Sequence, residues 1–201
     1  MRILKLTKET QDNILENLLK RSPNSYGEFE DRVNEIIQNV RDRRDEAIFE
    51  YTLKFDGARI DHSNIEVTEQ EIEEAYKEVD PKLLEVIRKA LVNIREYHMK
   101  QKQYSWFDSN ESGIMLGQKV TPLKTVGGDV PGGKAVYPSS VLMNVIPAKV
   151  AGVDHIVMTT PCGRDGKVYP STLVAAKEAG VDRIFKVGGA QAIAALAFGT
   201  E

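Results

Sequence analysis

The chain has 201 residues and a formal net charge of −3, from 27 basic and 30 acidic residues. Its composition, 41% hydrophobic and 28% charged, is typical of a soluble globular protein with one domain or slightly more. The weakly acidic balance argues against nucleic acid and against an anionic membrane surface as partners. No apolar run is long enough to span a bilayer, and the N-terminal segment turns polar too early for a secretory signal. The single cysteine cannot form an internal disulfide, so we expect a cytoplasmic protein.

Residues 1–118 are predicted to form a mainly helical, highly charged region. Apolar residues recur at helical spacing over residues 28–51, and Gly57 ends this pattern. A short strand is expected at Ile65–Val67, and residues 105–123 are expected to be extended. Helix starts are indicated by capping signals at Thr7, at the capping box Thr68–Glu71 and at Asp80–Pro81.

Residues 119–201 alternate short apolar runs with helical patterns. His155–Thr160 and Arg183–Val187 are predicted to be buried strands. A helix is expected before the first of these strands and after each of them. The order βαβαβα predicts an α/β fold in which helices cover a parallel sheet, as in nucleotide-binding proteins.

A glycine-rich segment precedes the first helix of this α/β region. It contains Gly127, Gly128, Gly132 and Gly133, which lack a side chain and can take positive φ or approach a ligand closely. Pro138 occupies the first helical position expected after it. A helix N-terminus beside such a loop suits an anion, usually a nucleotide phosphate, although a tight turn that binds nothing is the alternative.

A second glycine turn, Gly188–Gly189, opens the last helix. Right-handed crossovers place both glycine turns at the carboxyl edge of the sheet, where ligands bind in open α/β folds. We therefore expect the space between the two turns to hold a dinucleotide. Gln191 follows the second turn among alanines, where its amide can hydrogen-bond a ligand or, alternatively, cap the helix.

Other site types are matched only in part or not at all. Gly128–Lys134 resembles a P-loop, but Ala135 supplies no hydroxyl for Mg²⁺, and a G-x-G-x-x-G fingerprint is absent. Cys162 has no histidine near it in sequence and is not expected to be a nucleophile. No metal-ligand spacing connects the three histidines, His62, His98 and His155. A P-loop-like nucleoside-triphosphate binder using Lys134 stays as an alternative function.

Two long segments resemble the nucleotide-binding part of histidinol dehydrogenases. They are VPGGKAVYPSSVLMNVIPAKVAGVDHIVMTTP and VGGAQAIAALAFGTE, and the shorter pieces EYTLKFDG, NIREYHMKQ and LGQKVTPL agree with them. The resemblance covers nearly the whole chain. It implies an incomplete Rossmann-like parallel sheet with helices on both faces, over residues 119–201. It also implies a zinc-dependent homodimer that oxidises L-histidinol through histidinal to L-histidine, using two NAD⁺, in histidine biosynthesis.

The resemblance also implies roles for individual residues. Gln191 matches the NAD-contacting glutamine of the family's GGAQ motif, and we expect Gly132 and Gly133 to contact NAD as well. The family has a tyrosine just before V-P-G-G, where this chain has Asp129. Aspartate cannot stack on a ring, and it places a negative charge near a dinucleotide phosphate, so normal NAD affinity is not assured.

The family's zinc ligands and its histidine–glutamate proton-transfer pair lie in a part of those enzymes that follows the position of Glu201. The chain is therefore expected to be the N-terminal portion of such an enzyme, with no catalytic or metal-ligating residue and no activity alone. The alternative is a non-catalytic product, such as an assembly partner.

Overall fold

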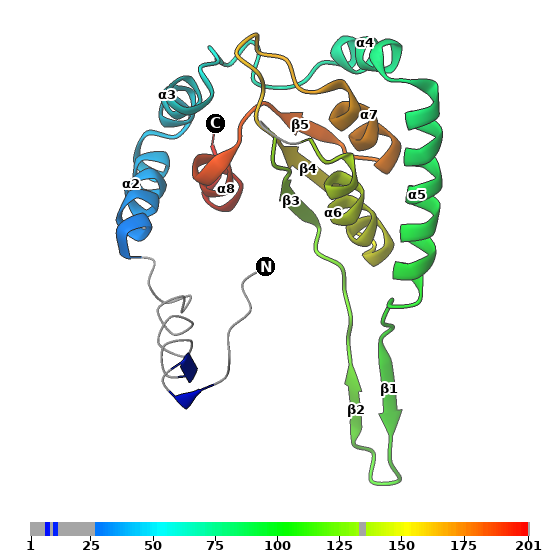
Figure 1. Ribbon diagram of the computed structural model, residues 1–201. Coiled ribbons are helices and arrows are strands. Elements are labelled where there is room, and N and C mark those ends of the chain that lie inside the picture. The colour runs from blue at the N-terminus through cyan, green and yellow to red at the C-terminus, as the bar shows by residue number, and fades with distance from the viewer. Residues whose placement is uncertain (1–6, 9, 12–26, 133–135, 201) are drawn as a thin grey trace.

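The computed structural model describes residues 7–8, 10–11, 27–132 and 136–200 (Figure 1). Most of the helix predicted after Thr7 therefore lies outside the described residues. Its first turn is capped as expected, because the Thr10 amide donates a hydrogen bond of 3.2 Å to the Thr7 hydroxyl.

The N-terminal region is helical, and its helix boundaries follow the predicted signals. Its described helices are α2 (Gly27–Arg43), α3 (Asp45–Asp56), α4 (Glu69–Glu78) and α5 (Pro81–Met99). In the capping box before α4, the Glu71 amide donates to the Thr68 hydroxyl at 3.2 Å, and the Thr68 amide donates to the Glu71 carboxylate at 2.9 Å. The Asp80 carboxylate caps α5 by accepting the Lys82 amide at 2.8 Å. Gly57 ends α3 with a φ of 70°. Among the described helices, none is long and apolar enough to cross a membrane.

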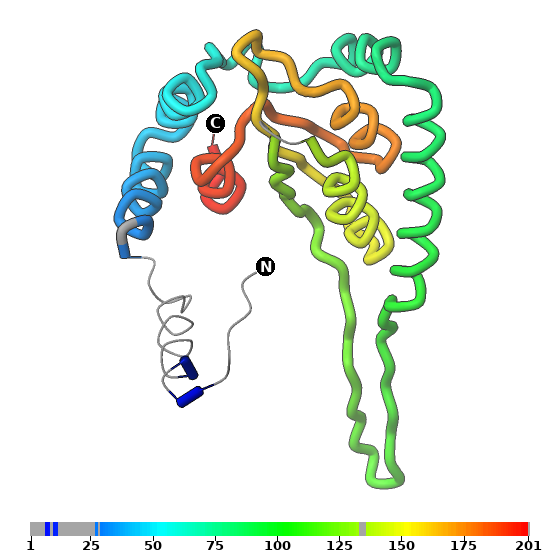
Figure 2. The backbone as a smooth tube through the Cα atoms, viewed as in Figure 1, coloured from blue at the N-terminus to red at the C-terminus, as the bar shows by residue number. Residues whose placement is uncertain are grey.

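The extended segment predicted over residues 105–123 is an antiparallel hairpin. Its strands are β1 (Trp106–Ser109) and β2 (Met115–Gln118), with Trp106 opposite Gln118. The hairpin projects away from the rest of the molecule (Figure 2). Its large apolar side chains are exposed, among them Tyr104, Trp106, Phe107, Ile114, Met115 and Leu116. A two-stranded hairpin is marginally stable by itself, so this arm stands out as an element without a core of its own.

The predicted βαβαβα order is confirmed. It consists of β3 (Thr125–Asp129), α6 (Pro138–Ala151), β4 (His155–Thr159), α7 (Pro170–Ala179), β5 (Arg183–Phe185) and α8 (Gly189–Phe198). The three strands form a parallel sheet in the order β3-β4-β5, with Gly127 opposite Val157 and Thr159 opposite Phe185. Pro138 occupies the first helical position of α6, as predicted.

Helices cover both faces of this sheet (Figure 1). Helices α6 and α7 lie on one face, with α4 and α5 packed outside them, and α8 lies on the other face against α2 and α3. The larger apolar core joins Ile72 of α4 and Ile87 of α5 to Leu142 of α6 and Met158 of β4. The N-terminal helices thus share a core with the α/β layer. The division into residues 1–118 and 119–201 stays a prediction.

The segment Ile65–Val67 pairs with the outer edge of β5. The Val67 amide donates to the Ile184 carbonyl at 2.9 Å, and the Lys186 amide donates to the Ile65 carbonyl at 2.8 Å. The short strand predicted here is therefore an isolated antiparallel bridge, between Glu66 and Phe185. It covers the β5 edge, whereas β3 forms the other edge of the described sheet.

A buried ion pair fixes α4 to the end of β5. Lys186 is 5% exposed, and its ammonium lies 2.5 Å from the Glu71 carboxylate. Burial by itself would raise the pKa of Glu71, but the Lys186 ammonium and the Thr68 amide outweigh it and hold this pKa below its usual value. Glu71 therefore stays ionised at neutral pH.

The first glycine turn is shorter than predicted. Gly127 and Gly128 lie inside β3, and the described glycines at positions 127, 128 and 132 do not have positive φ. Gly127 has a packing role instead, because a Cβ built there would lie 2.6 Å from Cδ2 of Leu196 in α8. Nothing lies within 4 Å of a Cβ built on Gly128. The sequence could not distinguish these two glycines, since the difference comes from a helix that lies about 70 residues further along the chain.

Gly127→Ala is expected to destabilise the fold by about 1–2 kcal/mol, because the added methyl group would displace the Leu196 side chain of α8 from its position against β3. Gly128→Ala is its matched control and should be neutral or stabilise by up to about 1 kcal/mol, through the lower entropy of the unfolded chain. Chemical denaturation of both variants measures the difference. Equal effects of the two substitutions would contradict the close contact between α8 and β3.

Lys186→Met is expected to cost about 3 kcal/mol near pH 7, because it leaves the Glu71 carboxylate partly buried without its partner. A carboxyl group whose pKa is lowered by folding contributes stability above its unfolded pKa and loses it as the pH falls through its folded pKa. The cost should therefore shrink below about pH 4. Denaturation curves over this pH range measure it, with the exposed Lys89→Met as control. A cost independent of pH would count against the ion pair.

Candidate functional site

The two glycine turns lie at the same, carboxyl edge of the sheet, as predicted. A Cβ built on Gly132 would lie 2.8 Å from Cγ of Pro161, and one built on Gly188 would lie 2.8 Å from Cδ of the same ring. Both glycines thus make room for Pro161, which follows β4. The Pro161 ring therefore packs against both turns, and the expectation that the space beside them holds a dinucleotide stays a prediction. No local pattern could have indicated this contact. Gly132 lies 29 residues before Pro161 and Gly188 lies 27 residues after it, so only the fold brings the three together.

The first glycine turn continues into Gly133 and Lys134, which lie outside the described residues. The cofactor contacts expected for Gly132 and Gly133 therefore remain predictions. The P-loop alternative loses support, because Gly128 lies inside β3 and helix α6 begins only at Pro138. In a P-loop the helix follows the lysine at once, so that its first amides surround the phosphates.

Gln191 lies in the first turn of α8 and is 2% exposed. Its side chain folds back toward the turn that opens the helix, since a Cβ built on Gly189 would lie 3.0 Å from its Oε1 atom. Gly189 has a φ of 73°, a conformation that glycine adopts without strain. The Gln191 amide therefore lies at the N-terminal end of α8, where it can contact a ligand or cap the helix.

Asp129 is the last residue of β3 and is half-buried. Its carboxylate accepts a hydrogen bond of 2.9 Å from the hydroxyl of Thr159, the residue beside it on β4. Burial raises the pKa of Asp129, and the Thr159 hydroxyl opposes this only in part. A carboxylate with one neutral donor and partial burial has capacity for further donors, such as hydroxyl groups.

An open cleft of about 590 Å³ lies beside β3, with Asp129 in its lining. Its walls come from β3, β4, α6 and α8, and they are mostly apolar, with Met143, Val145 and Ile193 among them and Asn144 as a polar exception. Gly128 opens onto free space. Clefts of this size and character accommodate small molecules or cofactors. The only ionisable group in its described lining is Asp129, so the cleft favours rings and hydroxyls over phosphates.

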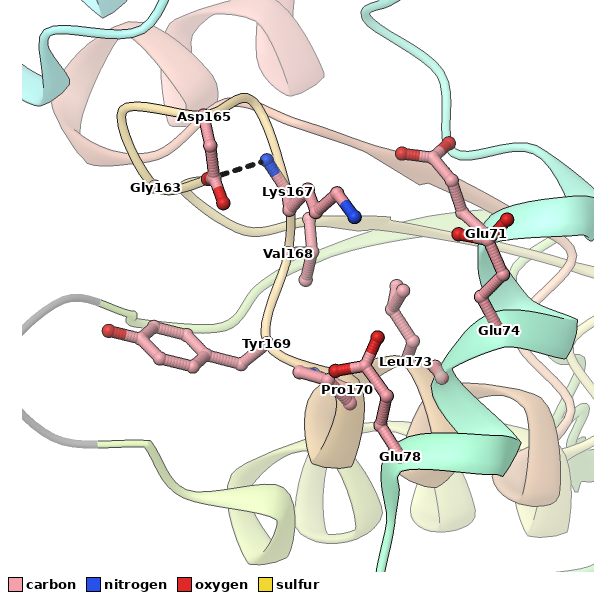
Figure 3. Close-up of a pocket in the computed structure, with 11 residues that line it drawn as sticks. Glu71, Glu74, Glu78, Gly163, Asp165, Lys167, Val168, Tyr169, Pro170 and Leu173 are labelled. Atoms are coloured by element: carbon pink, nitrogen blue, oxygen red, sulfur yellow. Dashed lines mark hydrogen bonds between the residues drawn. The ribbon is translucent and has the colours of Figure 1, made fainter.

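A smaller hollow of about 290 Å³ lies between α4 and the loop that leads into α7 (Figure 3). Glu71, Glu74 and Glu78 project from α4 on one side, and Lys167 and Tyr169 lie on the loop opposite. Sequence reasoning did not predict this hollow. Its surplus of carboxylates makes it unsuitable for the phosphates of a dinucleotide.

Cys162 and His62 lie in different surroundings, and the predictions that they are neither nucleophile nor metal ligand stay predictions. Cys162 is buried, and burial together with the nearby Asp56 carboxylate raises the pKa of its thiol, which disfavours the reactive thiolate. His62 is exposed, and its Nδ1 atom lies 3.4 Å from a carboxylate oxygen of Asp45. Among the described residues, no group of three or more histidine, cysteine, aspartate or glutamate side chains could hold a metal ion.

Sequence reasoning missed the β3 cleft itself. Asn144 and Ile193 line it, and both lie on helices that the sequence predicted without indicating a cleft between them. The exposure of Ile193, 53%, is the structural sign that α8 has an uncovered side. In the sequence, the one signal that could have suggested the cleft is a large isoleucine within a helix that is otherwise rich in alanine.

Comparisons with known proteins agree with the fold. The sequence model of the family described as histidinol dehydrogenase matches residues 19–201. The histidinol dehydrogenase of Geobacillus kaustophilus is 56% identical over 184 residues, which are 91% of this chain and 43% of that protein. The one from Heliobacterium mobile is 55% identical over 168 residues, 84% of this chain and 39% of that protein.

A crystal structure of histidinol dehydrogenase from Elizabethkingia anophelis superimposes with a TM-score of 0.80 at 34% sequence identity. The match covers 86% of this chain and 39% of that one. The chain thus spans less than half the length of these relatives. With nearly all of its own length matched in sequence and most of it in structure, the chain belongs to the histidinol dehydrogenase family.

Proposed function

We propose that this chain provides the NAD-binding part of a histidinol dehydrogenase, which oxidises L-histidinol through histidinal to L-histidine in histidine biosynthesis. The observation that carries the proposal is the family match over residues 19–201. The oxidation from alcohol to acid removes two electron pairs, so it requires two NAD⁺ in succession. When bound, NAD⁺ supplies the hydride acceptor.

The residues at the carboxyl edge fit part of a dinucleotide. The cleft beside β3 has apolar walls that suit a nicotinamide or adenine ring, whereas the Asp129 carboxylate in its lining disfavours a nearby phosphate. Gln191 lies in the first turn of α8, where backbone amides favour a phosphate. We assign NAD contacts to Gln191, Gly132 and Gly133, with Asp129 in place of the family's tyrosine.

The described residues do not fit the zinc ion of the family, because none of their acidic, histidine or cysteine side chains forms a group that could hold a metal. No step is therefore assigned to zinc. We propose that the zinc ligands, the groups that move the proton and the contacts to L-histidinol come from the remaining length found in the relatives. In that complete enzyme we expect a homodimer.

A non-catalytic role as an assembly partner is the second candidate. It is favoured by the exposed hairpin, whose apolar side chains, such as Trp106 and Leu116, face solvent. Exposed apolar patches of this kind mark protein interaction sites. Binding of NAD⁺ distinguishes the two candidates.

The 201-residue chain is expected to bind NAD⁺ but to produce no NADH when L-histidinol is added. Calorimetric titration measures the first property and absorbance of NADH the second. Gln191→Met keeps the length of the side chain but cannot hydrogen-bond, and it should weaken NAD⁺ binding by about three- to tenfold. Circular dichroism and thermal unfolding check that the variant is folded.

Absence of NAD⁺ binding in the unsubstituted, folded chain would reject the NAD-binding part of the proposal. NADH production that depends on L-histidinol would reject the assignment of the catalytic groups to the remaining length.

Asp129→Tyr is expected to tighten NAD⁺ binding by about tenfold, because a ring can stack on the cofactor and the negative charge near its phosphates is removed. Asp129→Asn removes the charge without adding a ring, so it separates the two effects and should give a smaller gain. Both are measured by the same titration. If Asp129→Tyr binds NAD⁺ no better than the unsubstituted chain, the family's cofactor arrangement does not apply to this cleft.

A further inference from the structure

A third hollow, of about 530 Å³, lies at the carboxyl edge on the β5 side of the sheet. It opens between the segment after α3 and the loop after β4. Lys186, which directly follows β5, also lines it, together with Glu71 of α4. The β3 cleft lies on the other side of the sheet order, beside the outer strand β3, so the two are separate sites. The hollow is nevertheless at the edge where open α/β sheets bind ligands.

The lining of this hollow is basic in a chain whose net charge is −3. It carries four cationic side chains and two carboxylates, which give its lining a formal charge of +2. The cations are Arg59, Arg164, Lys167 and Lys186, and the carboxylates are Glu71 and Asp165. A positive hollow in an acidic protein concentrates small anions there.

The two carboxylates of the hollow bind groups other than its two arginines. Lys186 and Glu71 neutralise each other in the buried pair at 2.5 Å, and the Asp165 carboxylate accepts the backbone amide of Lys167 at 3.1 Å. Within the described part of the chain, neither Arg59 nor Arg164 has a carboxylate within ion-pair distance. Their guanidinium groups are therefore free to bind an anion from solution.

Backbone hydrogen bonds hold the loop that carries Arg164 and Lys167 in place. The Gly163 amide donates to the Lys167 carbonyl at 2.8 Å, and the Gly166 amide donates to the Gly163 carbonyl at 2.9 Å, so the loop is a closed turn. Gly57 has a φ of 70°, and the stem of Arg164 packs over it, with Cγ 3.4 Å from where a Cβ would be. A preorganised arginine loses less entropy when it binds a ligand.

We propose that this hollow binds the phosphate group of a small phosphorylated metabolite. Two guanidinium groups and a lysine match the several oxygens and the double charge of a phosphate monoester better than they match a single carboxylate. The volume exceeds that of inorganic phosphate and leaves room for an attached sugar or similar group. A long polyanion such as nucleic acid is disfavoured, because Glu74 and Glu78 line the neighbouring hollow. The inference does not depend on the proposed NAD site.

The test is calorimetric titration of the folded 201-residue chain with inorganic phosphate, with AMP as a phosphate monoester and with adenosine as a ligand that lacks the phosphate. Both phosphates should bind and adenosine should not. Tighter binding of AMP would identify a phosphorylated metabolite as the ligand, whereas tighter binding of inorganic phosphate would overturn the metabolite assignment.

Arg164→Gln should weaken AMP binding by about tenfold or more, since it removes a charge-assisted hydrogen bond. Arg95→Gln removes the same charge from the exposed surface of α5 and should leave AMP affinity within about twofold. No phosphate binding, or equal losses in both variants, would overturn the proposal. A parallel loss of NAD⁺ affinity in Arg164→Gln would also overturn it, by assigning the hollow to the dinucleotide.

Discussion

The Pro161 ring is the contact on which the carboxyl edge of the sheet depends. It lies against Gly132 before α6 and against Gly188 before α8, and a Cβ at either position would meet the ring at 2.8 Å. The two turns that leave β3 and β5 are thus held against the turn that leaves β4. Because packed interiors tolerate little extra volume, a side chain at either glycine would have to separate these turns. The packing against Pro161 therefore gives a structural reason for glycine at both positions.

Two open hollows lie toward the outer strands of the sheet. One is the apolar cleft beside β3, with Asp129 in its lining, and the other is the basic hollow that Lys186 lines beyond β5. Their chemistry differs, because the first carries a carboxylate and the second carries a surplus of cations. A dinucleotide needs partners for its rings and its phosphates together, and the described lining of the β3 cleft offers apolar partners for the rings only. The phosphate partners we propose are backbone amides of the glycine turns and of the first turn of α8.

The apolar side chains of the described residues are covered unevenly. On one side, α4 to α7 cover the sheet with a continuous core that includes Ile146 and Val174, both fully buried. On the other side, α8 has an exposed Ile193, and the β1–β2 hairpin has no core of its own. Exposed apolar surfaces of this kind are typical of protein contacts. The proposals for zinc, substrate and dimer therefore concern the complete length of the relatives.

The sequence by itself determined the order of the elements and the boundaries of most helices, because these depend on local signals. The capping box at Thr68, the cap and proline at Asp80–Pro81, and the proline that starts α6 each act within one turn of helix. The two glycine turns were also placed on the correct edge, since crossovers in parallel sheets have a fixed hand.

Only the tertiary structure decided which glycine serves which purpose and where open space remains. Gly127 faces Leu196, Gly128 faces the cleft, and Gly132 and Gly188 face Pro161. These neighbours come from distant parts of the chain, so no local pattern could assign them. The pairing of Lys186 with Glu71, 115 residues apart, has the same origin. Local signals fix secondary structure, whereas contacts across the fold determine whether a small residue makes room for protein or for a ligand.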